Sequence, residues 1–362
     1  MKTNSIRSAV GFGVAVLCAG MAFSAQAAGW TIGQVAPLSG TGAAQGRAYS
    51  HGMRLYFDQV NKAGGVQGRP VELLVIDDAG QPNETIEKTR KLLSDTKPLA
   101  LAGYFGNKNL SALLDSKLLD ISSTSLVGYQ STDTRVLNAP QLFSSRAGLS
   151  EQMSKIASHL AVLGITKLAL VHDERSDAKE LSALVNKSVS SSGAQLVNGI
   201  TLGNGKKGLD AAIDKLKTKP AQAVLVVASS PNTAAFVEAY RLDGGLAQIY
   251  AMAEADVEQL AMRLPLEYLS GLSIAQVVPS PYKVSMRLNK EFQDSVAAAG
   301  KKLEVPVSFT MMEGYVNAKL LVEAMRRSQP LTPEKLTQTL RVLDGYDMGG
   351  YWISYKPGSQ IG

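Results

Sequence analysis

Cysteine is almost absent from this chain of 362 residues, whose one cysteine is Cys18. A single thiol excludes an intrachain disulfide and any metal centre built from several cysteines. Histidine is scarce as well: His51 and His159 fall on helical patterns with no second histidine four residues later, so we expect no metal site. Stability must therefore come from hydrophobic burial, and an apolar content of 45 % is sufficient for two cores.

A strong excess of charge of one sign is also lacking. The 37 Lys and Arg residues against 31 Asp and Glu give a net charge of +6, and the basic residues are scattered without interleaved aromatics. Such spacing is typical of solvated helix faces, so we expect no nucleic-acid partner. After the N-terminal segment there is no apolar run of the length, about 20 residues, that a membrane-spanning helix needs.

The N-terminal segment has the pattern of a bacterial export signal. Lys2 and Arg7 precede the apolar run 9–23, and the segment 24–28 follows with the small residues Ala25 and Ala27 at the positions that a signal peptidase accepts. We expect cleavage after Ala27, which makes 1–27 a signal peptide and places the mature protein in the periplasm.

Beyond this segment, short β-rich runs alternate with amphipathic stretches, the pattern of βαβ units around parallel sheets. The strands predicted for a first lobe are 30–36, 71–76, 99–103 and 118–122. Those predicted for a second lobe are 167–172, 195–200, 223–228, 249–252 and 272–278. Long helical patterns at 282–299, 309–328 and 333–343 follow, and we expect them to return to the first lobe. The fold class is thus α/β with two lobes.

Two motifs resemble catalytic or cofactor sites but depart from them. Gly40, Gly42 and Gly46 follow the first strand, and Asp77 ends the second, as in a dinucleotide site, but the glycine spacing and the distance to the acid differ from that fingerprint. Ser273 lies in a strand pattern without the final glycine of a nucleophile elbow. We therefore predict a glycine-rich turn, no cofactor and no catalytic residue.

Polar residues after two predicted strands are better candidates for ligand contact. Asn107 follows the strand 99–103 and precedes a helical pattern, so exposed amides there can bind an anion, with Tyr104 or Phe105 as an apolar wall. The alternative is that Asn107 caps the helix and the aromatics belong to the core. The segment 172–174, His-Asp-Glu, follows a second-lobe strand and is either part of a cleft or a solvated strand end.

Several segments together resemble one family, the substrate-binding proteins of branched-chain amino acid ABC transporters, which are type I periplasmic binding proteins. The segments that carry the resemblance are Pro37–Gly40, Asn61–Val71, Val75–Asp78, Val277–Pro281 and Glu313–Lys319. The resemblance extends from about Trp30 to the C-terminus.

The resemblance implies two Rossmann-like lobes joined by three crossings, near 143–147, 276–281 and 344–350, with the ligand in the cleft between them. The implied division assigns 28–145 and 278–346 to lobe I, and 146–277 and 347–362 to lobe II.

The resemblance also implies which residues line the cleft. Asn107 stands at the first-lobe clamp for a carboxylate, and Glu254 matches the acid that faces an α-ammonium group. The other implied positions are Thr124 and Ser125 as a second clamp element, Gln45 and Leu149 where relatives have aromatics, and Asp177 and Ser229 near positions where relatives have tyrosines. These departures leave the identity of the ligand open.

We therefore expect an extracytoplasmic solute-binding protein that performs no bond chemistry. Its ligand is a small carboxylate-bearing molecule, an amino acid or an organic acid, and its partner is an ABC permease of the inner membrane. We expect a monomer without metal or cofactor. The alternative is an exported sensor of the same fold that signals to a membrane receptor.

Overall fold

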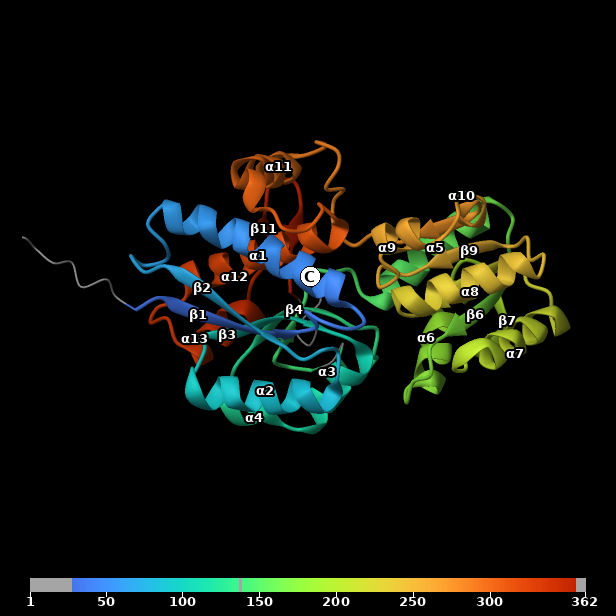
Figure 1. The fold of residues 1–362 in the computed structure, drawn as a ribbon, viewed down its shortest axis with the longest axis horizontal. Coiled ribbons are helices and arrows are strands. Elements are labelled where there is room, and N and C mark those ends of the chain that lie inside the picture. Colours follow the sequence, from blue (N-terminus) through green and yellow to red (C-terminus); the bar gives the residue numbers. More distant parts are fainter. Residues whose placement is uncertain (1–27, 137–138, 356–362) are drawn as a thin grey trace, which may run out of the picture.

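The computed structural model describes residues 28–136 and 139–355. They form two α/β lobes that lie side by side, as Figure 1 shows. This confirms the fold class expected from the alternation of strands and helices. Cys18, the export signal and its cleavage position lie outside the described residues.

Lobe I is built on a parallel sheet of strand order β2-β1-β3-β4-β5. Its strands are β1 (Trp30–Ala36), β2 (Val71–Asp77), β3 (Ala100–Phe105), β4 (Leu126–Gln130) and β5 (Leu142–Phe143). Its helices are α1 (Ala43–Lys62), α2 (Pro82–Asp95), α3 (Asn107–Asp115), α4 (Leu118–Ser122), α11 (Arg287–Ala299), α12 (Phe309–Arg327) and α13 (Pro333–Arg341).

Two glycines allow α1 and α12 to pack closely in lobe I. A Cβ atom at Gly52 of α1 would lie 1.9 Å from the carbonyl oxygen of Met311, and one at Gly314 of α12 would lie 2.2 Å from that of Tyr49. Neither position accepts a larger residue without moving a backbone. The close contact buries Tyr315 and its neighbours, so α12 forms part of the core of lobe I.

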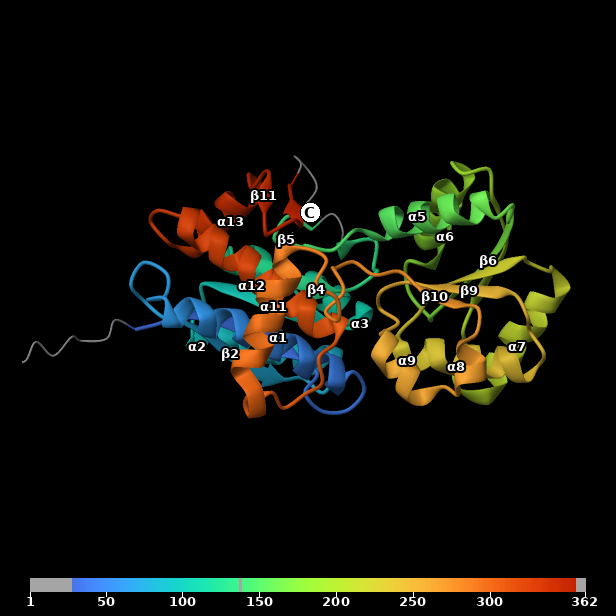
Figure 2. The same cartoon turned by 90° about the horizontal axis from the view of Figure 1, so that it is seen from above.

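Lobe II repeats the plan with the strand order β10-β9-β8-β6-β7, and its strands are also parallel. The strands are β6 (Lys167–His172), β7 (Gln195–Thr201), β8 (Ala223–Val227), β9 (Gln248–Ala251) and β10 (Leu272–Ile274). The helices are α5 (Leu149–Val162), α6 (Ala178–Ser190), α7 (Gly205–Thr218), α8 (Ser230–Leu242), α9 (Val257–Arg263) and α10 (Leu266–Leu269). Figure 2 shows α5 and α6 on one face of the sheet and α7, α8 and α9 on the other, and a separate apolar cluster fills each side.

The chain passes between the lobes from β5 to α5 and back from β10 to α11. The expected third passage is not seen within 347–355: Met348, Ile353 and Tyr355 pack in the lobe I core, together with the short strands β11 (Tyr346–Asp347) and β12 (Trp352–Ile353). The hydroxyl oxygen of Tyr351 lies within hydrogen-bonding distance of a carbonyl oxygen on each passage, 2.6 Å from that of Ser145 and 2.9 Å from that of Val277. The apolar side chains of 348–355 therefore bind this segment to lobe I, whereas the division implied by the family resemblance assigned 347–362 to lobe II.

One predicted strand is wrong. Residues 118–122 form the helix α4, and the next strand of the sheet is β4 at 126–130. A short apolar run does not distinguish a buried strand from a helical turn. Because of this shift, Thr124 and Ser125 precede a strand, where the sequence had them follow one.

Candidate functional site

A cavity of about 360 Å³ lies between the two lobes. Its walls come from loops at the carboxyl ends of parallel strands, where α/β folds commonly hold ligands. The lining residues of lobe I are Pro37, Thr41, Gly42, Gln45, Gly80, Phe105, Gly106, Asn107, Lys108, Asn109, Gln130 and Thr132. Those of lobe II are Asp173, Glu174, Leu202, Asn204, Ala228, Ser229, Ser230, Pro231, Asn232 and Glu254.

Asn107 organises the lobe I wall. Its Oδ1 accepts hydrogen bonds from the backbone N–H of Thr132 and the hydroxyl of Ser131, both at 2.8 Å. Its Nδ2 donates to Thr132 Oγ1 at 3.2 Å. Asn107 thus fixes the loop after β4 against the start of α3, and its amide oxygen is engaged within the protein.

The side chain of Thr132 lies on the cavity wall. Its oxygen accepts from Asn107 Nδ2 at 3.2 Å and from Arg175 Nη1 at 3.1 Å, which uses both lone pairs. Its approach of 3.5 Å to Asn107 Oδ1 is at the long limit for a hydrogen bond. Because α3 begins at Asn107, the backbone N–H groups of its first turn also lack intrahelical acceptors, and exposed Lys108 adds a positive charge. The lobe I wall therefore offers mainly hydrogen-bond donors.

The lobe II wall is acidic. Asp173 accepts from the backbone N–H of Ser229 at 2.8 Å and from Asn232 Nδ2 at 2.7 Å, so its carboxylate holds the start of α8. Glu254 has one oxygen, Oε1, 3.1 Å from Arg146 Nη2. Its other oxygen, Oε2, is buried and has no hydrogen-bond partner among the described residues. This oxygen is an acceptor on the lobe II wall.

Arg146 connects Glu254 to the opposite lobe. It lies on the first passage between the lobes, and its Nε is 3.6 Å from Oε1 of Glu313 on α12. The side chains of Arg146 and Glu313 are 5 % and 4 % exposed. Burial raises the pKa of Glu313, although the Arg146 charge and a hydrogen bond from Gln130 oppose that shift. Two carboxylates thus share one buried guanidinium beneath the cavity.

Four of the nine residues expected at the site line this cavity: Gln45, Asn107, Ser229 and Glu254. Tyr104 does not, because its side chain is fully buried in the lobe I core and its hydroxyl lies 3.0 Å from that of Thr89. Leu149 is buried in the lobe II core.

Three further expected residues also lie away from the cavity lining. Thr124 and Ser125 are buried next to the amino end of β4, whereas the cavity lies at the carboxyl ends of the strands. Asp177 pairs with Arg175 and contacts Thr134 of lobe I. It lies in the contact between the lobes.

Sequence reasoning missed Thr132 and Gln130. The polar run that follows β4 was the available signal, but it was hidden because the strand had been placed eight residues too early, at 118 instead of 126. Of the two interpretations left open for 172–174, the cleft holds for Asp173 and Glu174. His172 is buried, with its Nδ1 2.7 Å from the carbonyl oxygen of Asp173.

Two acids at the end of β2, Asp77 and Asp78, accept hydrogen bonds that support the neighbouring turns. Asp77 Oδ1 accepts from the backbone N–H groups of Leu38 and Ala79 at 2.8 Å, and its other oxygen accepts from the Ser39 hydroxyl. Burial alone would raise the pKa of Asp77, but these hydrogen bonds outweigh it and lower the pKa to about 2. Asp78 accepts from Thr85 and the backbone of Gly80. Both carboxylates therefore accept hydrogen bonds within the protein and support the turns around them.

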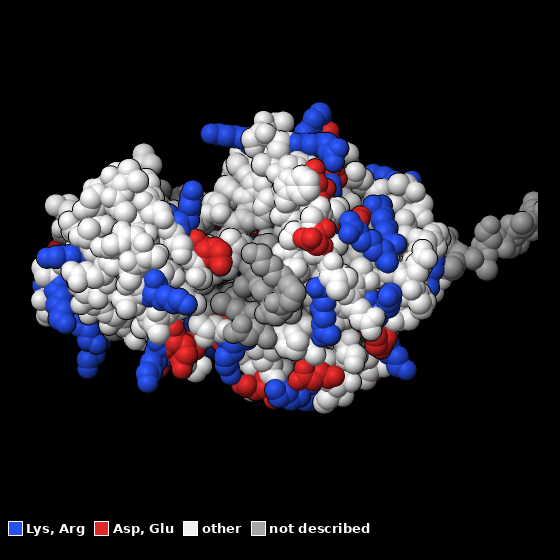
Figure 3. Space-filling model, turned by 180° about the vertical axis from the view of Figure 1, so that it is seen from behind, with Lys and Arg blue, Asp and Glu red and all other residues white. Residues whose placement is uncertain are grey.

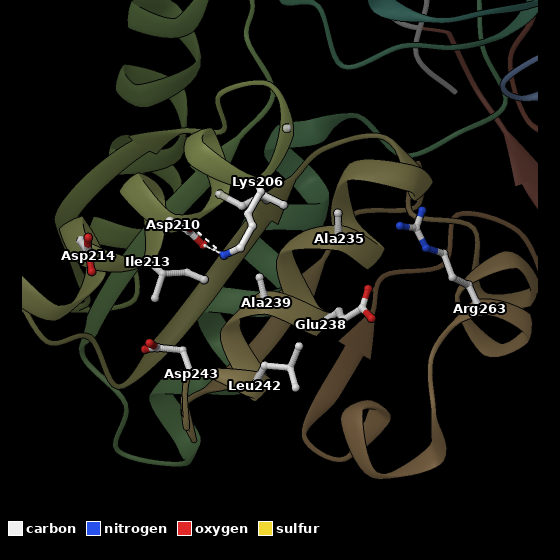
Figure 4. Close-up of a pocket in the computed structure, with 12 residues that line it drawn as sticks. Lys206, Asp210, Ile213, Asp214, Ala235, Glu238, Ala239, Leu242, Asp243 and Arg263 are labelled. Atoms are coloured by element: carbon white, nitrogen blue, oxygen red, sulfur yellow. Dashed lines mark hydrogen bonds and ion pairs between the residues drawn. The ribbon is translucent and has the colours of Figure 1, made fainter.

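A second depression, of about 700 Å³, lies on the outer surface of lobe II between α7 and α8 (Figure 4). Lys206 and Asp210, both on α7, form an exposed ion pair at 2.9 Å on one side of it. It contains no residue of lobe I and no buried unpaired group, so the interlobe cavity is the better candidate site. On the face in Figure 3, basic and acidic residues are interspersed over both lobes, without a continuous basic surface.

Within 28–136 and 139–355, none of the helices combines the length and the apolar character needed to cross a bilayer. Residues 29–358 match the family model of the periplasmic binding proteins. The crystal structure of a substrate-binding periplasmic protein from Ralstonia solanacearum superimposes with a TM-score of 0.82 at 31 % identity, covering 91 % of this chain and 95 % of that one.

Two relatives are named for amino acids. A Leu/Ile/Val-binding protein homolog from Brucella suis is 22 % identical over 98 % of this chain and 91 % of its own length. An amino acid binding protein from Pseudomonas aeruginosa is 24 % identical over 64 % of this chain, and the match spans only 62 % of that protein. Together with the two parallel-sheet lobes and the cavity between them, the match over nearly the whole chain shows that this protein belongs to the periplasmic binding protein family, type I.

Proposed function

We propose that this protein is the extracytoplasmic substrate-binding component of an ABC uptake system and that it binds an amino acid in the interlobe cavity. The family, the names of the relatives and the position of the cavity support this assignment. The protein performs no bond chemistry in this role, and its membrane partner is a permease. We also propose export with cleavage after Ala27, which N-terminal sequencing of the secreted protein tests.

The observation that carries the proposal is the unlike polarity of the two walls. Lobe I offers the Thr132 hydroxyl, the first-turn amides of α3 and the charge of Lys108, which suit a carboxylate. Lobe II offers Glu254 Oε2, a buried acceptor without a partner, which suits an ammonium group. An α-amino acid presents both groups to one cavity.

Closure of the lobes follows from this division. Each lobe holds only part of the ligand, so the closed form gains the contacts of both walls and the open form only those of one. The closed protein is the form that the permease recognises in this proposal. The ligand shifts the population by its difference in affinity for the two forms.

A thermal-shift screen with the twenty amino acids and a set of small organic acids tests the assignment. We expect an amino acid to raise Tm, and at about 100 times its Kd to add roughly 2.7 kcal/mol to the free energy of unfolding. The N-acetyl derivative and the carboxamide of that amino acid should each bind at least ten-fold more weakly, because each lacks one of the two charged groups.

Glu254→Gln and Glu267→Gln form a matched pair for calorimetry. Glu267 is an exposed residue of α10 and does not line the cavity. Glu254→Gln should weaken the amino acid by one to two orders of magnitude, since a hydrogen bond to a charged group contributes roughly 1.5–3 kcal/mol. Glu267→Gln should leave Kd unchanged. Equal affinity in both variants, or a plain organic acid as the tightest ligand, would contradict the amino acid assignment.

A further inference from the structure

Four residues join the lobes through polar contacts beside the cavity, and we call them the interlobe latch: Thr132 and Thr134 of lobe I, and Arg175 and Asp177 of lobe II. Arg175 Nη2 donates to the carbonyl oxygen of Thr132 at 2.6 Å, and Nη1 donates to its hydroxyl at 3.1 Å. Asp177 Oδ2 accepts from the backbone N–H of Thr134 at 2.8 Å and from its hydroxyl at 3.0 Å. Four hydrogen bonds therefore cross from one lobe to the other.

The lobe II half of the latch is a buried, two-point ion pair. Arg175 donates through Nε to Oδ1 of Asp177 and through Nη2 to Oδ2, the latter at 2.7 Å. The two side chains are 3 % and 6 % exposed. Because Asp177 fixes the planar guanidinium, the remaining donors of Arg175 are directed at Thr132.

The carboxylate of Asp177 stays ionised across the ordinary pH range. Burial alone would raise the pKa of Asp177, but the hydrogen bonds from Arg175 and Thr134 and the Arg175 charge outweigh it and lower the pKa to about 2. The contacts between the lobes are therefore charge-assisted at neutral pH.

The lobe I half is continuous with the cavity wall. Thr132 lines the cavity and is fixed from its own lobe by Asn107, so its loop receives hydrogen bonds from both lobes at once. All four contacts between the lobes join protein groups, so none of them requires a bound ligand. Opening the lobes would expose Arg175 and release the Thr132 hydroxyl from one of its two donors.

We propose that Arg175 is a positioning residue that holds the lobes closed in the absence of ligand and fixes Thr132 at the cavity. This inference concerns the resting conformation and does not depend on which ligand the cavity takes. In this proposal most ligand-free molecules are already closed. Little of the binding free energy of the ligand is therefore needed to shift the equilibrium between open and closed forms.

The distance between the lobes in ligand-free protein tests the proposal. Cys18 is the natural cysteine, so the full chain with Cys18→Ser accepts spin labels at Lys91→Cys in α2 and Lys187→Cys in α6, both exposed positions on different lobes. Double electron–electron resonance on this labelled chain should give one main, short distance. Arg175→Gln and Asp177→Asn should raise the population at longer distance at least five-fold, and Arg175→Lys, which retains one donor group, should reverse part of that change.

The controls separate the latch from a general loss of structure. Asp243→Asn breaks an ion pair of comparable length, 2.8 Å to Lys217, that lies wholly within lobe II, and it should leave the distance distribution unchanged. Thr132→Val alters the latch from lobe I without touching the buried ion pair and should also lengthen the distance, whereas Thr132→Ser should not. If the distribution is the same in wild type, Arg175→Gln and Thr132→Val, each folded by circular dichroism, the proposal is overturned. Failure of every amino acid in the thermal-shift screen would contradict the proposed function and leave this result standing.

Discussion

The two walls of the cavity differ in both charge and construction. The lobe I wall is organised by neutral hydrogen bonds around Asn107 and presents donors, whereas the lobe II wall carries three acids, Asp173, Glu174 and Glu254. The two lobes have the same architecture but present unlike surfaces to the cavity. The reason is that the polar and charged side chains lie on loops at the strand ends, and the sheets only set where those loops are. The comparison supports the proposed amino acid ligand, which carries opposite charges on its carboxylate and ammonium groups.

The largest effect should come from the group that connects the walls. Arg146→Met leaves the carboxylates of Glu254 and Glu313 buried without their common partner, and removal of one member of a buried ion pair costs about 3–5 kcal/mol. Urea denaturation measures this loss. Lys206→Met, which breaks an exposed pair on lobe II, should change the free energy of unfolding by less than about 1 kcal/mol. Equal losses in the two variants would show that the buried cluster has no special role.

The pH dependence of stability should reveal the lobe I member of that cluster. Burial raises the pKa of Glu313 above its usual 4.5, so the folded protein binds this proton more tightly than the unfolded chain does. The contribution of Glu313 to stability is therefore full below the usual pKa and falls as pH rises toward the folded value. Glu313→Gln should flatten this fall in urea denaturation curves measured from pH 4 upward, while Glu267→Gln keeps it. A wild-type slope in Glu313→Gln would mean that another group titrates.

A smaller loss of stability should show that the lobe I wall depends on the Asn107 side chain, whereas the contact of Ser229 in the lobe II wall uses its backbone. Asn107→Ala removes three hydrogen bonds to Ser131 and Thr132, and at roughly 0.5–1.5 kcal/mol each we expect a loss of about 2 kcal/mol in stability. Ser229→Ala keeps the backbone N–H that Asp173 accepts, so it should cost less than about 0.5 kcal/mol. Thermal or urea unfolding compares the two. If the costs are equal, the loop after β4 does not depend on Asn107.

The smallest effect should be seen at Tyr104, which the sequence placed at the site and the structure places in the core. Tyr104→Phe removes a hydroxyl that lies 3.0 Å from Thr89, at a cost of about 1 kcal/mol in stability. Ligand affinity in calorimetry should stay the same because the side chain is fully buried away from the cavity. A weaker ligand with unchanged stability would return Tyr104 to the site.

Much of the fold could be predicted because parallel strands buried on both faces read as apolar runs of the expected length. The strands at 30–36, 71–76, 167–172 and 223–228 were predicted within a residue or so of their observed bounds. Two predictions differ more. Residues 118–122 form a single helical turn with the same apolar composition, and of the predicted strand 272–278 only Leu272–Ile274 is a strand. Because the strand was placed too early, the polar residues that follow β4, Thr132 among them, were not considered as candidates.

The sequence by itself determined the α/β class and the lack of disulfides, since both depend on composition and on periods that local residues carry. The position of Asn107 after a predicted strand pointed to the cavity, and the family resemblance added Gln45, Ser229 and Glu254. Only the tertiary structure decided what those residues do there, because their partners are distant in the chain. The backbone N–H of Thr132 donates a hydrogen bond to the amide oxygen of Asn107. Arg146 pairs with one carboxylate oxygen of Glu254, and the other oxygen has no partner among the described residues. Asp177 was placed in the latch for the same reason, since a hydrogen bond between lobes requires two surfaces that the sequence alone does not bring together.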